Sequence, residues 1–159
     1  DPGRGLKNVL LLRTMSKGYA LAGLRFGYGL GDPGLIAALD KVRDSYNTDI
    51  LAQVAAFAAL ESRHEAARSW QAVYEQRERV AAELGALGFT VLPSQANFVL
   101  ASPPPDGPDA MNLYESLKEK RILVRYFDQE RLRNKLRITI GTPLQNDTLL
   151  TAVNELLTG

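Results

Sequence analysis

Residues 13–28 read RTMSKGYALAGLRFGY and contain the densest polar cluster of the chain. They follow an apolar run at 8–12 and include the start of a second apolar run at 24–30. Short apolar runs of this kind are typical of strands. Between the runs lie hydroxyl groups, a lysine, glycines and an arginine. We therefore expect residues 8–12 to form a strand buried on both faces, residues 24–30 to form a second strand, and residues 13–22 to form a loop.

Periodicity and capping residues predict the remaining elements. Asp32 and Pro33 can begin a helix, and Asp109 can cap another that runs to about residue 121. Thr142-Pro143-Leu144-Gln145 is a capping-box pattern for a last helix to residue 157. The other expected elements are a buried Ala-rich helix at 50–61, a long amphipathic helix at 63–87 ended by Gly88, and strands at 89–92, 97–101, 122–127 and 136–140.

Composition excludes several classes of protein. The 159 residues carry 19 Lys plus Arg against 18 Asp plus Glu, so a nucleic acid or an anionic membrane is not an expected partner. No apolar run approaches about 18 residues, so no membrane-spanning helix is expected. The chain has no Cys, and its single histidine is His64. No metal site and no Ser-His-Asp triad are therefore expected, and we expect His64 to lie on the surface.

Two common motifs can be weighed within residues 13–34. A serine–lysine hydrolase needs Ser three residues before Lys, whereas here Ser16 adjoins Lys17, so this chemistry is disfavoured. The spacing Gly29-x-Gly31-x-x-Gly34 is formally that of a dinucleotide-binding loop. Pro33 removes a backbone donor where a pyrophosphate needs one, so we interpret these glycines as a strand end, a turn and a capped helix.

A third chemistry is a lysine that forms a Schiff base with a carbonyl. Its amine must be deprotonated part of the time, and burial or a neighbouring cation such as Arg25 would favour that state. The hydroxyls of Thr14 and Ser16 and the guanidinium of Arg25 could hold the phosphate of an aldehyde cofactor. An ordinary polar loop with a solvated Lys17 explains the same composition, so both interpretations stay open at this point.

Residues 13–19 and 21–28 closely resemble the cofactor-lysine segment of the fold-type I, class I and II pyridoxal-phosphate aminotransferases. The family pattern is Arg-Thr-x-Ser-Lys followed by Leu-Ala-Gly-Leu-Arg-x-Gly-Tyr, with the arginine eight residues after the lysine. Lys17 and Arg25 keep that spacing. Within the family, the segment is most similar to that of the histidinol-phosphate aminotransferases.

The resemblance extends along the rest of the chain. Residues 93–98 (PSQANF) are similar to a family segment that makes Asn97 a candidate substrate-binding residue. Residues 122–125 (ILVR) resemble the strand whose arginine contacts the substrate phosphate, which implies this role for Arg125. Residues 136–142 (LRITIGT) resemble the segment whose arginine binds the substrate α-carboxylate, which implies this role for Arg137. The interval between the two arginines is compatible with neighbouring strands that present both guanidiniums to one cleft.

The resemblance implies an α/β enzyme that uses pyridoxal 5'-phosphate. Lys17 would form the Schiff base and move protons, while Ser16, Arg25 and Thr14 would bind the cofactor phosphate. The substrates would be an amino acid or amino phosphate, histidinol phosphate above all, and 2-oxoglutarate, in a cytoplasmic homodimer that serves histidine biosynthesis. The expected domains are the end of a large domain with a mixed, mostly parallel sheet at 1–62, a long interdomain helix at 63–88 and a small α+β domain at 89–159.

Two alternatives stay open. Relatives that act on aromatic amino acids, or that decarboxylate threonine phosphate, share much of the pattern. In the family, the acidic partner of the pyridine nitrogen and the aromatic residue that stacks on the ring precede the lysine, and residues 1–16 match neither. The start Asp1-Pro2-Gly3-Arg4-Gly5 is no signal peptide. We therefore expect the C-terminal part of a longer enzyme, catalytically incomplete by itself.

Overall fold

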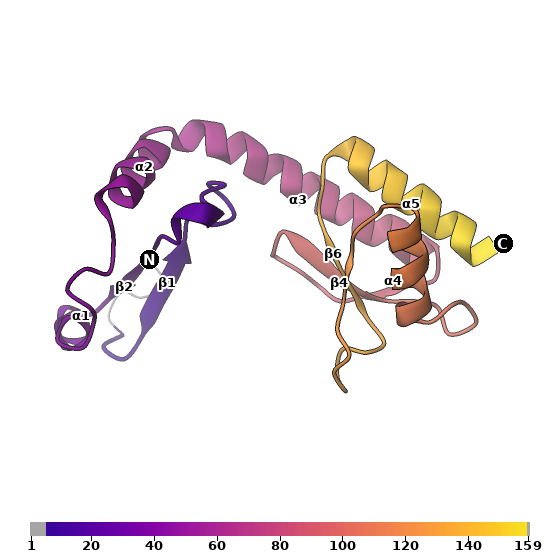
Figure 1. Ribbon diagram of the computed structural model, residues 1–159, viewed down its shortest axis with the longest axis horizontal. Helices are drawn as coiled ribbons and strands as arrows, with labels where there is room; N and C mark the ends of the chain where they lie inside the picture. Colours follow the sequence, from indigo (N-terminus) through magenta and orange to yellow (C-terminus); the bar gives the residue numbers. More distant parts are fainter. Residues whose placement is uncertain (1–5, 159) are drawn as a thin grey trace. The chain divides into compact units, whose positions relative to one another are not determined.

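The computed structural model describes residues 6–158. The expectation about residues 1–5 concerns positions outside this range. The chain forms two compact units that divide between Trp70 and Gln71, and Figure 1 shows the elements of each. The elements follow the expected order of two strands, three helices, two strands, a helix, two strands and a helix, with one short 3₁₀ helix added at Ala22–Leu24.

The first unit begins with two antiparallel strands, β1 (Leu10–Thr14) and β2 (Gly27–Gly31). Their register pairs Leu10 with Gly31 and Thr14 with Gly27. The expected strands at 8–12 and 24–30 are therefore present but shifted toward the C-terminus. Arg13 and Thr14 lie in β1, which corrects their expected place in a loop.

The expectation that the first strand is buried on both faces is wrong for the described residues. Leu12 is 71% exposed, and every residue of β2 is exposed. Among the described strands, β1 pairs only with β2. An apolar run shows that a strand can be buried, but the layers that bury it must come from elsewhere in the fold.

The helices of the first unit begin at aspartate caps. The Asp32 carboxylate accepts from the Gly34 amide at 2.9 Å at the start of α1 (Pro33–Asp40). The Asp49 carboxylate accepts from the Ala52 amide at 2.9 Å at the start of α2 (Ile50–Glu61). Of the residues of α2, Ala52 and Ala56 are buried, whereas the large side chains of Ile50, Leu51, Val54 and Phe57 are exposed.

The expectation that α2 is buried is therefore wrong for the described residues. A helix that is apolar all round needs neighbours on every side, and the described residues cover only the strip of α2 that contains Ala52 and Ala56.

The long helix α3 (Arg63–Ala86) agrees with the expected helix at 63–87. Val80 and Leu84 of its predicted apolar stripe are fully buried. Gly88 follows the helix with a φ of +88°, a left-handed conformation that glycine adopts without strain. None of the described helices is both long enough and apolar enough to cross a membrane.

The second unit contains a four-stranded antiparallel sheet in the order β3-β4-β6-β5. Its strands are β3 (Thr90–Val91), β4 (Phe98–Ser102), β5 (Arg125–Tyr126) and β6 (Leu136–Thr139). One face of the sheet carries the buried side chains Val99, Ala101, Leu136 and Ile138. These side chains belong to a single core with residues of α3, α4 (Ala110–Glu119) and α5 (Pro143–Thr158). The opposite face of the sheet is free of this core.

The caps of the second unit agree with the sequence. The Asp109 carboxylate accepts from the Asn112 amide at 2.8 Å. The Thr142 amide donates to Gln145 Oε1 at 2.9 Å, and the Gln145 amide donates to Thr142 Oγ1 at 3.4 Å, which is the reciprocal pair of a capping box. The helix expected to reach residue 121 ends at Glu119, and Arg121 has a φ of +62°.

Candidate functional site

Lys17 lies in a tight turn that follows β1, and it is exposed. The strand ladder continues beyond Thr14, because the Met15 amide donates to the Phe26 carbonyl at 3.1 Å. The Leu21 amide donates back to the Met15 carbonyl at 3.1 Å, and the Met15 side chain is fully buried. Met15 therefore closes the base of the turn.

The other polar residues expected beside Lys17 lie at the same end of the β1–β2 pair. Ser16 and Arg25 are the next residues outward from the Met15–Phe26 pair. The Thr14 hydroxyl accepts from the Ser16 amide at 3.1 Å, so it helps to shape the turn. Arg25 has a φ of +51°, and its Nη1 donates to the Ala22 carbonyl at 2.9 Å. A lysine, two hydroxyls and a guanidinium thus gather around one exposed turn.

Trp70 of α3 contacts this lysine turn directly. Its Nε1 donates to the Gly18 carbonyl at 2.7 Å, across 52 residues of sequence. Its ring meets the ring of Tyr19 edge-on, with centroids 5.4 Å apart. A Cβ atom at Gly18 would lie 2.7 Å from Trp70 Nε1, so any larger residue there would require the Trp70 ring or the turn to shift. The hydrogen bond spans 52 residues of sequence, so no local pattern could have revealed it.

Arg125 and Arg137 lie directly opposite each other on β5 and β6. The neighbouring strands expected for these two arginines are therefore present. Arg137 is paired on its other side with Leu100 of β4. Side chains alternate along a strand, so both arginines lie on the face of the sheet away from the buried core. Arg125 is exposed and Arg137 is half-buried.

Aromatic rings pack against both guanidiniums. The Cζ atoms of Arg125 and Arg137 lie 5.2 and 5.5 Å from the ring centroid of Phe127, and Arg137 also lies 5.5 Å from that of Phe98. The Nε atom of Arg137 is buried and has no hydrogen-bond partner among the described residues. Phe127 was not among the predicted site residues. Its position two residues after Arg125, on the same face of an extended segment, was the signal available for it.

Asn97 immediately precedes β4, next to the ring that contacts Arg137. Its carbonyl accepts from the Ile140 amide at 2.9 Å, which connects the start of β4 to the end of β6. The Ser94 hydroxyl donates to the Phe98 carbonyl at 2.6 Å and accepts from the Ala96 amide at 3.1 Å. The segment before β4 is therefore held in place by hydrogen bonds.

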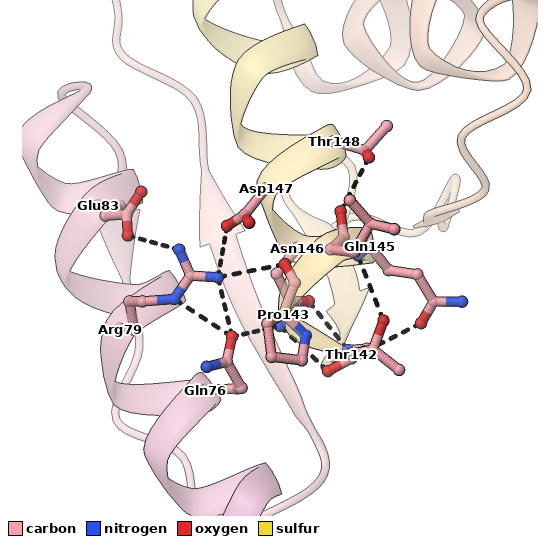
Figure 2. A network of polar contacts seen from close by, with 11 residues as sticks. Gln76, Arg79, Glu83, Thr142, Pro143, Gln145, Asn146, Asp147 and Thr148 are labelled. Carbon is pink, nitrogen blue, oxygen red and sulfur yellow. Dashed lines mark hydrogen bonds and ion pairs between the residues drawn. The ribbon is translucent and has the colours of Figure 1, made fainter.

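A polar network fixes the segment between β6 and α5 (Figure 2). The buried Asn146 side chain accepts from the Gly141 amide at 3.0 Å, and its Nδ2 donates to the Gly141 carbonyl at 3.1 Å and to Gln76 Oε1 at 3.0 Å. Arg79 donates to Gln76 Oε1 at 2.8 Å and forms an ion pair with Asp147 at 2.8 Å. The hydrogen bond to Asp147 raises the pKa of the Arg79 guanidinium. The network connects α3 to the loop that follows the strand of Arg137.

His64, the remaining residue singled out in the sequence, lies near the start of α3. Its side chain is 71% exposed and lies 3.2 Å from the carboxylate of Glu65. The predicted surface position is confirmed.

The model of the family "Aminotransferase class I and II" matches residues 4–153, so the chain belongs to this family. It is 50% identical over 151 residues to "Histidinol-phosphate aminotransferase 1" of a Nostoc species, a match that covers 95% of this chain and 42% of that protein. It is 49% identical over 150 residues to "Histidinol-phosphate aminotransferase" of Microcystis aeruginosa, which covers 94% of this chain and 42% of that protein. The chain therefore spans about two fifths of the length of these curated relatives.

The fold is similar to that of solved aminotransferases. The crystal structure of histidinol-phosphate aminotransferase from Sinorhizobium meliloti in complex with pyridoxal-5'-phosphate has a TM-score of 0.81 and 30% sequence identity to this chain. That match covers 95% of this chain and 41% of the solved one. The α/β fold expected from the sequence, that of part of a pyridoxal-phosphate aminotransferase, is confirmed by this likeness.

Proposed function

We propose that this chain supplies the cofactor lysine and the substrate arginines of a pyridoxal-phosphate-dependent aminotransferase that acts on histidinol phosphate with 2-oxoglutarate. The observation that carries the proposal is the gathering of Lys17, Ser16 and Arg25 at one exposed turn. Family membership and the names of the relatives at about half identity support the same activity.

The donor set at the turn fits pyridoxal phosphate chemically. An exposed primary amine can reach a carbonyl carbon, and a hydroxyl and a guanidinium are the groups that hold a phosphate. Arg25 is well suited to phosphate because its backbone conformation is fixed in the turn and one of its nitrogens is tied to Ala22, which leaves other donors of the guanidinium fork available. The Thr14 hydroxyl keeps lone-pair capacity beyond its bond from Ser16.

The chain's own residues have distinct roles in the proposed mechanism. Bound pyridoxal phosphate supplies the electron sink that makes the substrate Cα–H acidic. Lys17 would hold the cofactor through its side-chain amine, and the same amine, when free, would remove the proton from the substrate Cα as a general base. Ser16 and Arg25 keep the cofactor phosphate in position, so that the proton transfer occurs in one geometry.

The arginines of β5 and β6 select the substrate in this proposal. Arg137 binds the carboxylate of 2-oxoglutarate or glutamate, and Arg125 binds the phosphate of histidinol phosphate. Asn97, which precedes Phe98 in the sequence, also binds substrate in this proposal. A preference for aromatic amino acids, or decarboxylation of a phosphorylated amino acid, is the second candidate. It uses the same lysine turn and differs in what Arg125 contacts.

We also propose the domain assignment that accompanies this function. Residues 1–62 belong to the cofactor-binding large domain, residues 63–88 form the interdomain helix and residues 89–159 form the small domain of a homodimeric enzyme. The missing acidic partner of the pyridine nitrogen is then supplied by a segment of the longer chain.

A spectral titration tests the proposal. The chain is mixed with pyridoxal phosphate, and the absorbance of the imine is followed in the unaltered chain, in Lys17→Ala and in Lys41→Ala, which removes another exposed lysine. We expect a saturable signal that Lys17→Ala abolishes and Lys41→Ala retains. Equal loss in the two variants would contradict the assignment of Lys17.

A further inference from the structure

The ring of Phe127 lies against two like charges. Arg125 and Arg137 are directly opposite in an antiparallel pair, an arrangement in which like charges destabilise the sheet. Both guanidinium carbons nevertheless lie within 5.5 Å of the same ring centroid. The electron-rich face of an aromatic ring attracts a cation, so Phe127 offsets the repulsion that the register creates.

Neither arginine is neutralised by a carboxylate in the described part of the chain. The arginine ion pairs described there belong to Arg43, Arg68, Arg77 and Arg79. Arg137 has in addition a buried Nε atom without a hydrogen-bond partner among the described residues. The pair therefore keeps two positive charges that no described carboxylate offsets, and an anionic ligand would offset them.

An aromatic ring attracts a guanidinium through its charge and offers it no oxygen or nitrogen acceptor. All five N–H donors of arginine lie in the plane of the group. The contacts with Phe127 and Phe98 thus restrain the Arg137 guanidinium without consuming the donors that a carboxylate needs. The same holds for Arg125, whose aromatic contact is with Phe127.

We propose that Phe127 is a positioning residue that holds the guanidiniums of Arg125 and Arg137 at a fixed spacing, so that the pair prefers a ligand with two anionic groups. The inference rests on the proposed function, in which the two arginines bind substrate, and adds that one aromatic ring, that of Phe127, sets the positions of both guanidiniums. A ligand with a single carboxylate engages one arginine and gains little from the spacing.

The test measures the binding of glutarate, a dicarboxylate, and of butyrate, which lacks its second carboxylate. The arginine Nε–Hε resonances of the isotope-labelled chain are followed by NMR at low ionic strength, where charge interactions are least screened. In the unaltered chain we expect glutarate to bind about tenfold more tightly than butyrate, since it makes a second charge-assisted contact. Equal affinities would overturn the proposal without any variant.

Two substitutions isolate the ring. Phe127→Leu keeps an apolar side chain but removes the aromatic face. We expect it to lower the affinity for glutarate about fivefold and to change the affinity for butyrate less than about twofold. Phe127→Tyr keeps the face and should restore the preference. If Phe127 had a purely structural role, its replacement would lower the affinity for both ligands in parallel, or Phe127→Tyr would restore the glutarate preference no better than Phe127→Leu. Either result would overturn the proposal. The amide spectrum of β4 and β6 reports whether each variant keeps its sheet.

The outcome separates this inference from the proposed function. Uptake of pyridoxal phosphate at Lys17 does not depend on Phe127, which belongs to the second unit. If the dicarboxylate preference is found but Lys17 takes up no cofactor, the proposed function fails and the role of Phe127 stands. If Lys17 takes up the cofactor and glutarate shows no preference, only the role of Phe127 fails.

Discussion

At the scale of single residues, Arg125 and Arg137 are paired across β5 and β6 but have unequal surroundings. The Arg137 guanidinium contacts the rings of both Phe98 and Phe127 and has one buried donor. Arg125 is exposed, and its one aromatic contact among the described residues is with Phe127. The restrained guanidinium suits the carboxylate of 2-oxoglutarate or glutamate, the co-substrate that every amino donor shares. The exposed guanidinium suits a group that varies between substrates.

This difference predicts how the two arginines divide substrate recognition. In the complete aminotransferase that we propose, Arg125→Ala should lower kcat/KM for histidinol phosphate about 100-fold, because a charge-assisted contact is lost. It should change kcat/KM for phenylalanine less than about threefold. Arg137→Ala should lower kcat/KM for every carboxylate-bearing substrate. An equal effect of Arg125→Ala on both amino donors would contradict the phosphate contact.

Gly18 is a second residue whose role can be tested by one substitution. Gly18→Ala would place a Cβ atom 2.7 Å from Trp70 Nε1 and disturb the hydrogen bond to the Gly18 carbonyl. We expect it to lower the free energy of unfolding by about 1–2 kcal/mol. Trp70 is the single tryptophan of the chain, so its fluorescence during urea unfolding reports this region.

Gly23→Ala is the matched control, because a Cβ atom at Gly23 meets nothing within 4 Å. It should change the free energy of unfolding by less than about 0.5 kcal/mol. If both glycine variants unfold at the same urea concentration, the contact between Trp70 and Gly18 does not stabilise the turn.

At the scale of elements, the network between α3 and the start of α5 concentrates its hydrogen bonds on one buried side chain. Asn146 is 2% exposed and makes three hydrogen bonds, two to Gly141 and one to Gln76. The Asp147 ion pair with Arg79 lies beside it but is largely exposed. Buried polar groups lose more than exposed ion pairs when a partner is removed.

Asn146→Ala should therefore destabilise the second unit by about 2–3 kcal/mol, since it leaves backbone groups of Gly141 unsatisfied. Asp147→Ala, one position away, should cost less than about 1 kcal/mol. Urea unfolding followed by circular dichroism compares the two. A larger loss for Asp147→Ala would show that the ion pair rather than the buried amide holds the α5 junction.

The same elements show what the sequence can and cannot predict. The starts of α1, α4 and α5 were predictable because Asp32, Asp109 and Thr142 cap their helices through contacts within three residues. The burial of β1 and α2 was not, because it depends on which elements cover them. An irregular segment around Lys17 was predicted from its own residues and is present, while the cofactor role that the family resemblance implies for Lys17 stays a prediction.

The aromatic contacts of the lysine turn and of the two arginines were not predicted. The Trp70 contact spans 52 residues, so no local pattern reveals it. Phe127 reaches both arginines only once the β5–β6 register is fixed. Contacts of this kind follow from tertiary structure, which periodicity and capping do not determine.

At the scale of the whole molecule, the two units differ in the amount of apolar surface they bury. The first unit contains three of the buried residues, namely Met15, Ala52 and Ala56, while the remaining buried apolar residues form the core of the second unit. Local stability follows buried apolar contact. We therefore expect the second unit to be the more stable of the two.

Limited proteolysis of the chain measures this difference. Trypsin should cut first after Lys41 and Arg43, which lie in the exposed segment between α1 and α2, and a fragment that contains residues 71–158 should persist. Hydrogen exchange should be slowest in β4, β6 and α5. Early cleavage within 71–158 would contradict the expected order of stability.

The central claim is that Lys17 is the residue that binds pyridoxal phosphate. The most direct measurement is reduction of the mixture of chain and cofactor with borohydride, followed by peptide mapping of the modified lysines by mass spectrometry. We expect the adduct to concentrate on Lys17 at cofactor concentrations that leave Lys7 and Lys41 largely unmodified, and we expect Arg25→Ala to reduce it. An adduct spread evenly over the exposed lysines, or none on Lys17, would contradict the account.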